Sequence, residues 1–367
     1  MNVTHINNDL LNIFKEVTQI SALSQNEKPV ADYIKLFFEK LSIPFYEDNS
    51  QTDTKSNTGN IIAEINGGGD FILTSHMDTA RSTENVKIIL KDDRITSDGN
   101  TVLGVDNRAG VAILLTLLHK IKTEKLDVIP FSVAFTVCEE TTLAGSKKIE
   151  LKDKIKNAFV FDSYLDPGFI VNNALGAATF KYKVIGKASH SGISPEKGIN
   201  SIKIVSKILS ALEQGEVEEN TTLNVGKIEG GTAVNVVPEI TTFEGEIRSS
   251  DKAKIESKLS QLNSLVKKEC KNFAAEYKSN IIWDFEPYFI SEDNNAYKAV
   301  FDAIVKADLT PIAALSRGGS DANSFNARGI TALNLGIGAK NPHSNDEYIL
   351  SKDFNNAFQI AINLVLK

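Results

Sequence analysis

The first half of the chain alternates short apolar runs with helical patterns, and this alternation limits the fold more than any other feature of the sequence. Four apolar runs have the length of strands: residues 60–65, 71–75, 131–138 and 158–162. Helical patterns cover residues 27–41 and 108–123. Strands that alternate with helices favour a mostly parallel sheet flanked by helices. The sequence therefore predicts an α/β fold for this half.

The order of the predicted elements changes near Ala178. From there the pattern runs strand, helix, strand, strand, helix and strand, over residues 178–186, 198–214, 221–229, 239–248, 251–271 and 276–285. This βαββαβ order is the split unit of a small antiparallel sheet with two helices, an α+β arrangement of the ferredoxin-like type. A helix, a strand and a helix follow, over residues 295–307, 331–337 and 352–366. We therefore predict a larger domain of residues 1–177 and 287–367, into which residues 178–286 are inserted.

The composition excludes several classes of protein. With 42% hydrophobic and 24% charged residues, the 367-residue chain has the composition of a globular protein. Its formal net charge of -7 provides no basic surface for a nucleic acid. No run of about 20 apolar residues suits a membrane span, and the opening residues lack the pattern of a secretory signal. We therefore expect neither a nucleic acid nor a membrane as a partner.

The two cysteines bear on the compartment and on the chemistry. Cys138 and Cys270 give no disulfide framework, so a reducing, cytoplasmic environment fits the sequence best. Cys138 stands next to Glu139 and is therefore a candidate catalytic thiol. The favoured interpretation is a small core residue on a strand, because free cysteines are commonly buried.

Acids and histidines fall just past the carboxyl ends of the predicted strands. Six side chains share this position: His76, Asp78, Glu139, Glu140, Asp162 and His343. In open α/β sheets this edge forms the ligand crevice, so we expect the six side chains to converge. Two histidines and several carboxylates are suitable ligands for two divalent cations. The sequence therefore predicts a two-metal site.

Asp106 is the candidate ligand that bridges the two metals. It lies in the turn GVDNRAG just before a predicted helix, and its two oxygens could bind one metal each at a separation of ~3.5 to 4 Å. A solvated loop or a helix cap is the alternative for Asp106 taken alone.

The neighbours Glu139 and Glu140 require a bend in the chain, because consecutive strand residues point to opposite faces. With a bend, one of them can bind metal while the other acts as general base toward a metal-activated, bridging hydroxide. Asp78 is placed to hold the second ring nitrogen of His76, with a plain surface acid as the alternative.

Several motifs in this order resemble the dinuclear zinc exopeptidases that include peptidase T. They are HMDT at 76–79, GVDNRAG at 104–110, CEET at 138–141, FDSY at 161–164 and PHSNDE at 342–347. The segments KASHSGISPEKGINSI, GKIEGGTAVNVVPE and GGSDANSFNARGI resemble the shorter, peptidase T-like branch. The resemblance covers nearly the whole chain. It implies a catalytic domain of the zinc-exopeptidase type with an inserted lid and dimerisation domain.

The resemblance also implies roles for the site residues. Two sets of metal ligands are implied: His76, Asp106 and Asp162 for one ion, and Asp106, Glu140 and His343 for the other. Glu139 is the implied general base. The Asp at position 162 favours aminopeptidase action, because deacylating relatives tend to carry Glu there. Zinc is the first choice of metal, with cobalt or manganese as alternatives.

Five further residues are candidates for substrate contacts. By resemblance, His190 in KASHSG stabilises the oxyanion, from its own subunit or from a neighbouring one. Arg248 suits a peptide carboxylate, with a plain salt bridge as the alternative. Asn235 is a candidate contact to the peptide backbone, although a turn-forming Asn explains it nearly as well. Gly319 and Ser320 lie at a predicted helix start, where free N–H groups favour an anion, and helix capping is the favoured interpretation of the next residue, Asp321.

These observations favour a cytosolic metallo-aminopeptidase that acts on tripeptides or other short peptides. The first alternative is an amidohydrolase that deacylates N-acyl amino acids with the same metals and base. The second is a non-catalytic scaffold that binds a peptide. The resemblance raises the expectation of a homodimer through the lid domain. No role is assigned to His5 or His119.

Overall fold

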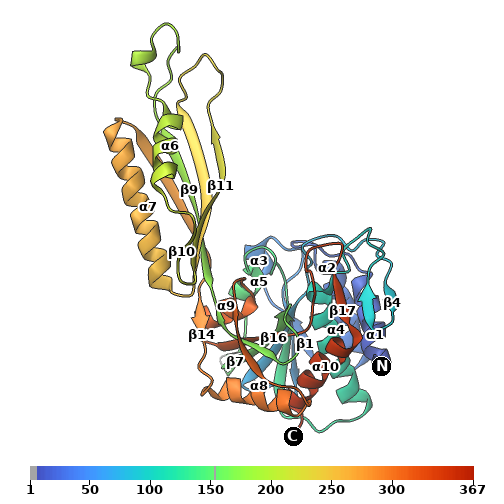
Figure 1. Cartoon of the computed structure of the whole chain (residues 1–367). Helices are drawn as coiled ribbons and strands as arrows, with labels where there is room; N and C mark the ends of the chain where they lie inside the picture. Colours follow the sequence, from blue (N-terminus) through green and yellow to red (C-terminus); the bar gives the residue numbers. More distant parts are fainter. Residues whose placement is uncertain (1–5, 153) are drawn as a thin grey trace. The chain divides into compact units, whose positions relative to one another are not determined.

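A computed structural model describes residues 6–152 and 154–367, so His5 lies outside the described residues. The chain forms two compact units (Figure 1). The larger unit contains the chain up to Asn173 and from Phe289 to Lys367, and the smaller unit is Ala174–Tyr288. The sequence placed the ends of the insert at 178 and 286, a few residues inside these bounds. The insert begins earlier because its first strand already starts at Gly176.

The described residues of the larger unit form a nine-stranded sheet. Its order is β1-β2-β6-β3-β7-β16-β8-β14, with β15 paired to β8. The strands are β1 (Phe45–Glu47), β2 (Ile61–Ile65), β3 (Phe71–His76), β6 (Phe131–Thr136), β7 (Asn157–Ser163), β8 (Phe169–Ala174), β14 (Tyr288–Phe289), β15 (Ile312–Ser316) and β16 (Thr331–Gly336). The central strands β6, β3, β7 and β16 are parallel, whereas β2 and β8 pair antiparallel with their neighbours. The predicted mostly parallel sheet therefore corresponds to the centre of the observed one.

Helices cover this sheet and explain the long apolar runs (Figure 1). Every residue of β3 and β6 is buried, as expected for parallel strands that are covered on both faces. The helices are α1 (Asn8–Thr18), α2 (Lys28–Lys40), α3 (Gln51–Thr54), α4 (Val105–Thr123), α5 (Ala144–Lys148), α8 (Asn295–Val305), α9 (Asp321–Ala327) and α10 (Ser351–Val365). Helix α4 packs on β3 and lies against α1 and α10. Its residues 111–118 are all buried, so this helix is the centre of the core.

A second, three-stranded sheet of the larger unit was not predicted. It contains β4 (Ile89–Lys91), β5 (Arg94–Thr96) and β17 (Tyr348–Leu350), in the order β17-β5-β4. Strands of three residues are too short to show the two-residue period by which a strand is recognised. Across the described residues, each helix is either too short or too polar to cross a membrane.

The smaller unit is a five-stranded antiparallel sheet with two long helices. Its elements are β9 (Gly176–Ile185), the short helix η1 (Pro195–Lys197), α6 (Ser201–Ala211), β10 (Gly215–Glu218), β11 (Thr221–Gly230), β12 (Ile240–Ser249), α7 (Lys252–Asn272) and β13 (Glu276–Phe285). The order β11-β12-β9-β13 is that of the predicted βαββαβ unit, and β10 adds a fifth strand at the β11 edge. Residue 214 was predicted to end a helix, but α6 ends at Ala211 and β10 pairs with β11 through a tight turn at Asn220.

The core of the insert contains a buried hydroxyl that offers a test of its packing. The ring of Tyr182 stacks on Phe243, with centroids 5.3 Å apart. Among the described residues, the hydroxyl of Tyr182 has no hydrogen-bond partner. We expect Tyr182→Phe to raise the free energy of unfolding by about 1 kcal/mol, because it removes an unpaired buried polar group. Chemical denaturation measures the change, with Tyr277→Phe, a partly exposed neighbour, as the control. A loss of stability in Tyr182→Phe would contradict this packing.

Candidate metal centre

His76 and Asp162 meet at the carboxyl ends of two adjacent parallel strands. His76 is the last residue of β3, and Asp162 is the last but one of β7, so both lie within their strands rather than past them. The Nε2 atom of His76 lies 3.2 Å from Oδ1 of Asp162 and 3.1 Å from Oδ1 of Asp106. The structure therefore brings these three predicted ligands together in one group.

Asp106 also faces a second group through its other oxygen. Its Oδ2 lies 3.2 Å from Nε2 of His343, and the same ring nitrogen lies 2.9 Å from Oε1 of Glu140. Within each group of three, the ligand atoms lie within 4.8 Å of one another. Asp106 thus presents one oxygen to each group, which is the arrangement required of a bridging carboxylate.

A bend in the backbone places Asp106 at this position. It lies in the first turn assigned to α4, but Asp106 and Asn107 are not helical and the peptide bond between them is cis. The residue before this turn, Gly104, has a φ of 74°, which a residue with a side chain rarely adopts. The regular helix therefore begins at Arg108, where the sequence predicted it.

The two imidazoles are surrounded by negative charge. Burial alone would lower the pKa of His76, but Asp162, Asp106 and Asp78 raise it well above its ordinary value. Contacts with Asp106 and Glu140 raise the pKa of His343 to about 10. The same two imidazoles hold the pKa of Asp106 below its usual range, against the effect of burial.

Three other carboxylates of the centre have raised pKa values, in contrast to Asp106. The pKa values of Glu139, Glu140 and Asp162 are raised, mainly by burial, and neighbouring carboxylates add to the effect. Burial and mutual repulsion disfavour the charged form of these acids. Divalent cations bound among them would stabilise that charged form. The donor set and its electrostatics therefore fit two metal ions.

Glu139 and Glu140 follow a bend, as their neighbouring positions require. Strand β6 ends at Thr136, and Cys138 has a φ of 53°, in the left-handed region. Cys138 is buried, as predicted, but it lies past the strand and not on it. Burial raises the pKa of its thiol to about 12, which makes it a poor nucleophile.

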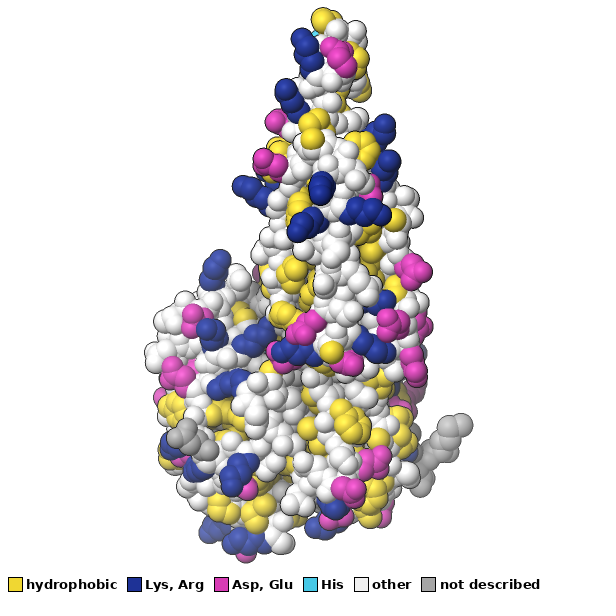
Figure 2. Space-filling view, turned by 90° about the vertical axis from the view of Figure 1, so that its left-hand side faces the viewer, with side chains coloured by type: hydrophobic (Ala, Val, Ile, Leu, Met, Phe, Trp, Pro, Cys, Tyr) yellow, Lys and Arg dark blue, Asp and Glu magenta, His cyan; other side chains and the backbone are white. Residues whose placement is uncertain are grey.

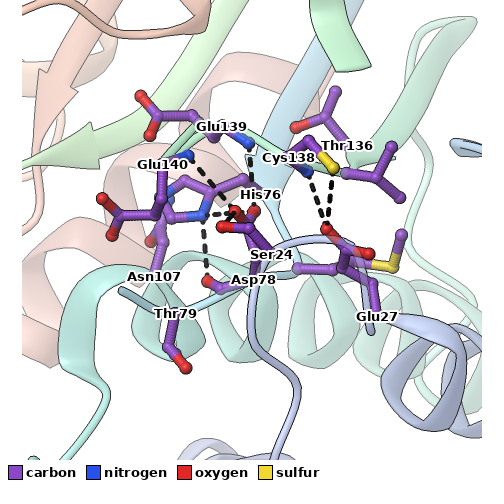
Figure 3. Close-up of polar contacts among 12 residues, drawn as sticks. Ser24, Glu27, His76, Asp78, Thr79, Asn107, Thr136, Cys138, Glu139 and Glu140 are labelled. Atoms are coloured by element: carbon purple, nitrogen blue, oxygen red, sulfur yellow. Dashed lines mark hydrogen bonds and ion pairs between the residues drawn. The ribbon is translucent and has the colours of Figure 1, made fainter. Parts of the chain in front are cut away.

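Asp78 supports both His76 and the bend (Figure 3). Its Oδ1 lies 3.3 Å from Nδ1 of His76, the ring nitrogen that faces away from the ligand group. The two oxygens of Asp78 accept the backbone N–H groups of Glu139 and Glu140, each at 3.2 Å. Ser24, which the sequence did not single out, donates its hydroxyl to Oδ2 of Asp78 at 2.7 Å. Asp78 is fully buried, so the alternative of a surface acid is wrong.

Asn107 is a second residue that sequence reasoning missed. Its side-chain N–H₂ group donates to Oδ1 of Asp162 at 2.9 Å and to the backbone carbonyl of Phe161 at 2.8 Å. Its side-chain oxygen, Oδ1, accepts the N–H of Gly110. Asn107 therefore fixes the orientation of Asp162. The available signal was its place beside Asp106 in the turn GVDNRAG.

Three predicted substrate residues belong to the smaller unit. His190 follows β9 in a loop, and the N–H of the next residue, Ser191, donates to the carbonyl of Asn235. Nδ1 of His190 accepts the N–H groups of Gly192 and Ile193, so the neutral ring carries its proton on Nε2. Arg248, near the end of β12, pairs with Glu246 through two hydrogen bonds of 3.1 Å.

Gly319 and Ser320 lie before α9 in the larger unit. The N–H of Ser320 donates to Oδ1 of Asn323 at 3.0 Å, and the Ser320 side chain completes a capping box. Capping therefore accounts for Ser320, and we do not assign its amide to a substrate anion. The next residue, Asp321, is buried and accepts the hydroxyl of Thr136 at 2.5 Å.

Two families match parts of the chain. Residues 60–180 match Peptidase family M28, and residues 173–274 match the Peptidase dimerisation domain. The uncharacterized protein YqjE of Bacillus subtilis is 28% identical over 342 residues, which is 92% of each chain. A peptidase T of Clostridium botulinum is 25% identical over 330 residues, which is 86% of this chain and 79% of the relative.

Two solved structures share the whole architecture. The aminopeptidase PepT of Bacillus cereus has a TM-score of 0.90 at 27% identity, and a tripeptidase of Staphylococcus aureus has a TM-score of 0.92 at 29% identity. Each comparison covers 98% of both chains. The fold and the paired groups of histidine and carboxylate ligands define a metallopeptidase of the M20 type. In sequence and in fold the chain resembles the peptidase T-like members of that family, which supports the predicted resemblance and confirms the predicted fold class.

Proposed function

We propose that this chain is a two-metal aminopeptidase that removes the N-terminal residue from tripeptides or other short peptides. The observation that carries the proposal is Asp106, which presents one oxygen to each of two ligand groups. Two sets of ligands would hold the ions: His76, Asp106 and Asp162 for one, and Asp106, Glu140 and His343 for the other. Zinc is the proposed metal, with cobalt or manganese as alternatives, because imidazole and carboxylate ligands together suit these ions.

The chain's own residues would supply proton transfer and orientation. Bound divalent cations would activate a water molecule and polarise the peptide carbonyl. Glu139 would take the proton of that water on its carboxylate and pass it to the leaving amine. Asp78 would hold the His76 ring, since it lies beside the nitrogen that faces away from the ligand group.

The insert would contribute contacts to the substrate. We assign His190 to the oxyanion, because its proton lies on Nε2 and can be donated. Arg248 would bind the peptide carboxylate and Asn235 the peptide backbone, and Gly319 of the larger unit remains a proposed contact. A homodimer through the insert is also proposed. The match to the Peptidase dimerisation domain supports it, as do the exposed hydrophobic side chains that lie among Lys and Arg on the insert (Figure 2).

A cytoplasmic location is proposed as well. Cys138 and Cys270 are both free and buried, which fits a reducing compartment.

A peptide panel tests the proposed activity. Protein loaded with zinc, cobalt or manganese is incubated with Ala-Ala-Ala, its N-acetylated form, and N-acetyl and N-succinyl amino acids. We expect release of the N-terminal alanine from the free tripeptide. The blocked tripeptide should react at least about tenfold more slowly, because it lacks the charged amine that an aminopeptidase site binds. Protein treated with a chelator is the control. Equal rates with blocked and free peptides, or a preference for N-acyl amino acids, would contradict aminopeptidase action.

A further inference from the structure

The turn that carries Glu139 and Glu140 is held by side chains from outside its own sequence (Figure 3). We call residues 138–140 the acidic turn. Its three successive backbone N–H groups all donate to carboxylates. Cys138 donates to Oε1 of Glu27 at 2.9 Å, and the next two N–H groups donate to the two oxygens of Asp78. Two distant carboxylates therefore fix the backbone of this turn.

Glu27 is fully buried, and both of its oxygens are occupied. Besides the Cys138 amide, Oε1 accepts the N–H of Gln25 at 2.9 Å and the thiol of Cys138 at 3.2 Å. The other oxygen, Oε2, accepts the hydroxyl of Ser56 at 2.5 Å. A buried carboxylate is costly unless hydrogen bonds replace its hydration. The donors on Oε1 hold that oxygen directly behind the acidic turn.

Cys138 is the residue in the turn that most needs such support. Its φ of 53° lies in the left-handed region, which residues with a side chain rarely occupy and which persists only where the surroundings hold it. Glu27 contacts both the amide and the thiol of this residue. Because Glu139 comes next in the chain, the backbone angles of Cys138 set the direction in which the following side chains leave the turn.

The segment that contains Glu27 also holds the other carboxylate. Ser24, three residues earlier, donates its hydroxyl to Asp78. Residues 24–27 therefore supply one of the two carboxylates that bind the acidic turn and contact the other, although the turn lies more than a hundred residues further along the chain. Asp78 in turn lies beside His76, so this segment links the ligand histidine to the turn.

We propose that Glu27 is a positioning residue, which holds Cys138 in the left-handed conformation and thereby directs Glu139 and Glu140 into the metal centre. The inference rests on the proposed function for the roles of base and ligand. Residues that support metal ligands from behind typically change metal affinity or activity about 10- to 100-fold when they are replaced. Glu27 acts on the reaction only through the acidic turn and touches no reacting atom.

Kinetics and metal content test this role in the metal-loaded, full-length protein. Glu27→Ala should lower kcat for Ala-Ala-Ala about 10- to 100-fold with little change in KM, and should weaken metal binding at the site that includes Glu140. Glu27→Gln keeps an acceptor oxygen for the Cys138 amide and should restore part of kcat. Ser56→Ala is the matched control, because it removes the bond to the other oxygen of Glu27 and leaves the turn in place. Its kcat should stay close to that of the wild type.

Amide exchange provides a readout that does not depend on activity. Hydrogen–deuterium exchange of residues 138–140 should be faster in Glu27→Ala than in the wild type and unchanged in Ser56→Ala. If the metal-loaded wild type hydrolyses no peptide, the proposed function fails, whereas faster exchange would still support the inference. If the wild type is active and Glu27→Ala keeps its kcat and its slow exchange, the inference is overturned, even when the melting temperature falls. If Glu27→Ala does not fold, Glu27→Met takes its place, because methionine has a similar size but no oxygen to accept the Cys138 amide. A Glu27→Met variant with the kcat and slow exchange of Ser56→Ala overturns the inference, and one with a lower kcat and faster exchange supports it.

Discussion

Glu139→Gln should lower kcat by about 10²- to 10⁴-fold while the protein keeps its metal, since this is the range that a general base contributes. Glutamine has nearly the same size and shape as glutamate but cannot take up a proton from water. The backbone N–H of residue 139 remains bound to Asp78 in this variant, so the turn should keep its conformation. Steady-state hydrolysis of Ala-Ala-Ala measures kcat, and elemental analysis of the same sample measures the bound metal.

Glu124→Gln is the control for this experiment. Glu124 lies at the exposed end of α4, 3.6 Å from Lys120, and its replacement should leave kcat and metal content unchanged. The structure also groups Glu139 with His76 and Glu140 at distances that suit a shared metal ion. Loss of metal in Glu139→Gln would therefore assign Glu139 as a ligand, and full activity in that variant would remove it from the reaction altogether.

The position of the centre could be predicted from the sequence because it follows from sheet topology. Strands β6, β3 and β7 are adjacent and parallel, so residues at their carboxyl ends must lie close together. His76 ends one of these strands and Asp162 lies near the end of another. The bend at Glu139 also followed from the sequence, because two neighbouring acids on a regular strand point to opposite faces.

Three residues that support the centre could not be predicted in this way. Ser24, Glu27 and Asn107 act through hydrogen bonds to residues 54 to 111 positions away along the chain. Such contacts leave no periodic pattern and no strand end to mark them. In the sequence, a buried glutamate before a helix looks the same as a solvated capping residue. Only the packing of α2 against the sheet shows that Glu27 is buried behind the acidic turn.

The limits of the fold prediction have a related cause. Long apolar runs such as 131–138 indicated buried strands, but β6 stops at Thr136 because the chain bends toward the centre. Strand β10 has four residues and a largely exposed pattern, so neither its period nor its hydrophobicity marked it as a strand in the sequence. Its pairing with β11 supplies the stability that its own sequence does not show.

Asp106→Asn should remove both metal ions and abolish activity, whereas changes at the other ligands should affect one ion each. The reason is the geometry of Asp106, whose Oδ1 faces His76 and whose Oδ2 faces His343. An asparagine presents one neutral oxygen and one N–H₂ group, which cannot bind a cation, so the bridge is lost together with its negative charge. Asp162 belongs only to the first group and His343 only to the second.

Metal stoichiometry separates a bridging role for Asp106 from that of an ordinary ligand. The wild type should bind about two ions per chain, Asp162→Asn and His343→Ala about one, and Asp106→Asn fewer than either. Asp92→Asn is the control, because Asp92 lies in an exposed turn with a φ of 58°, which asparagine tolerates. Thermal unfolding in excess chelator checks that the variants fold alike without metal. If Asp106→Asn retains one tightly bound ion and Asp162→Asn retains none, the two ligand groups do not share Asp106, and the bridge must be sought elsewhere in the centre.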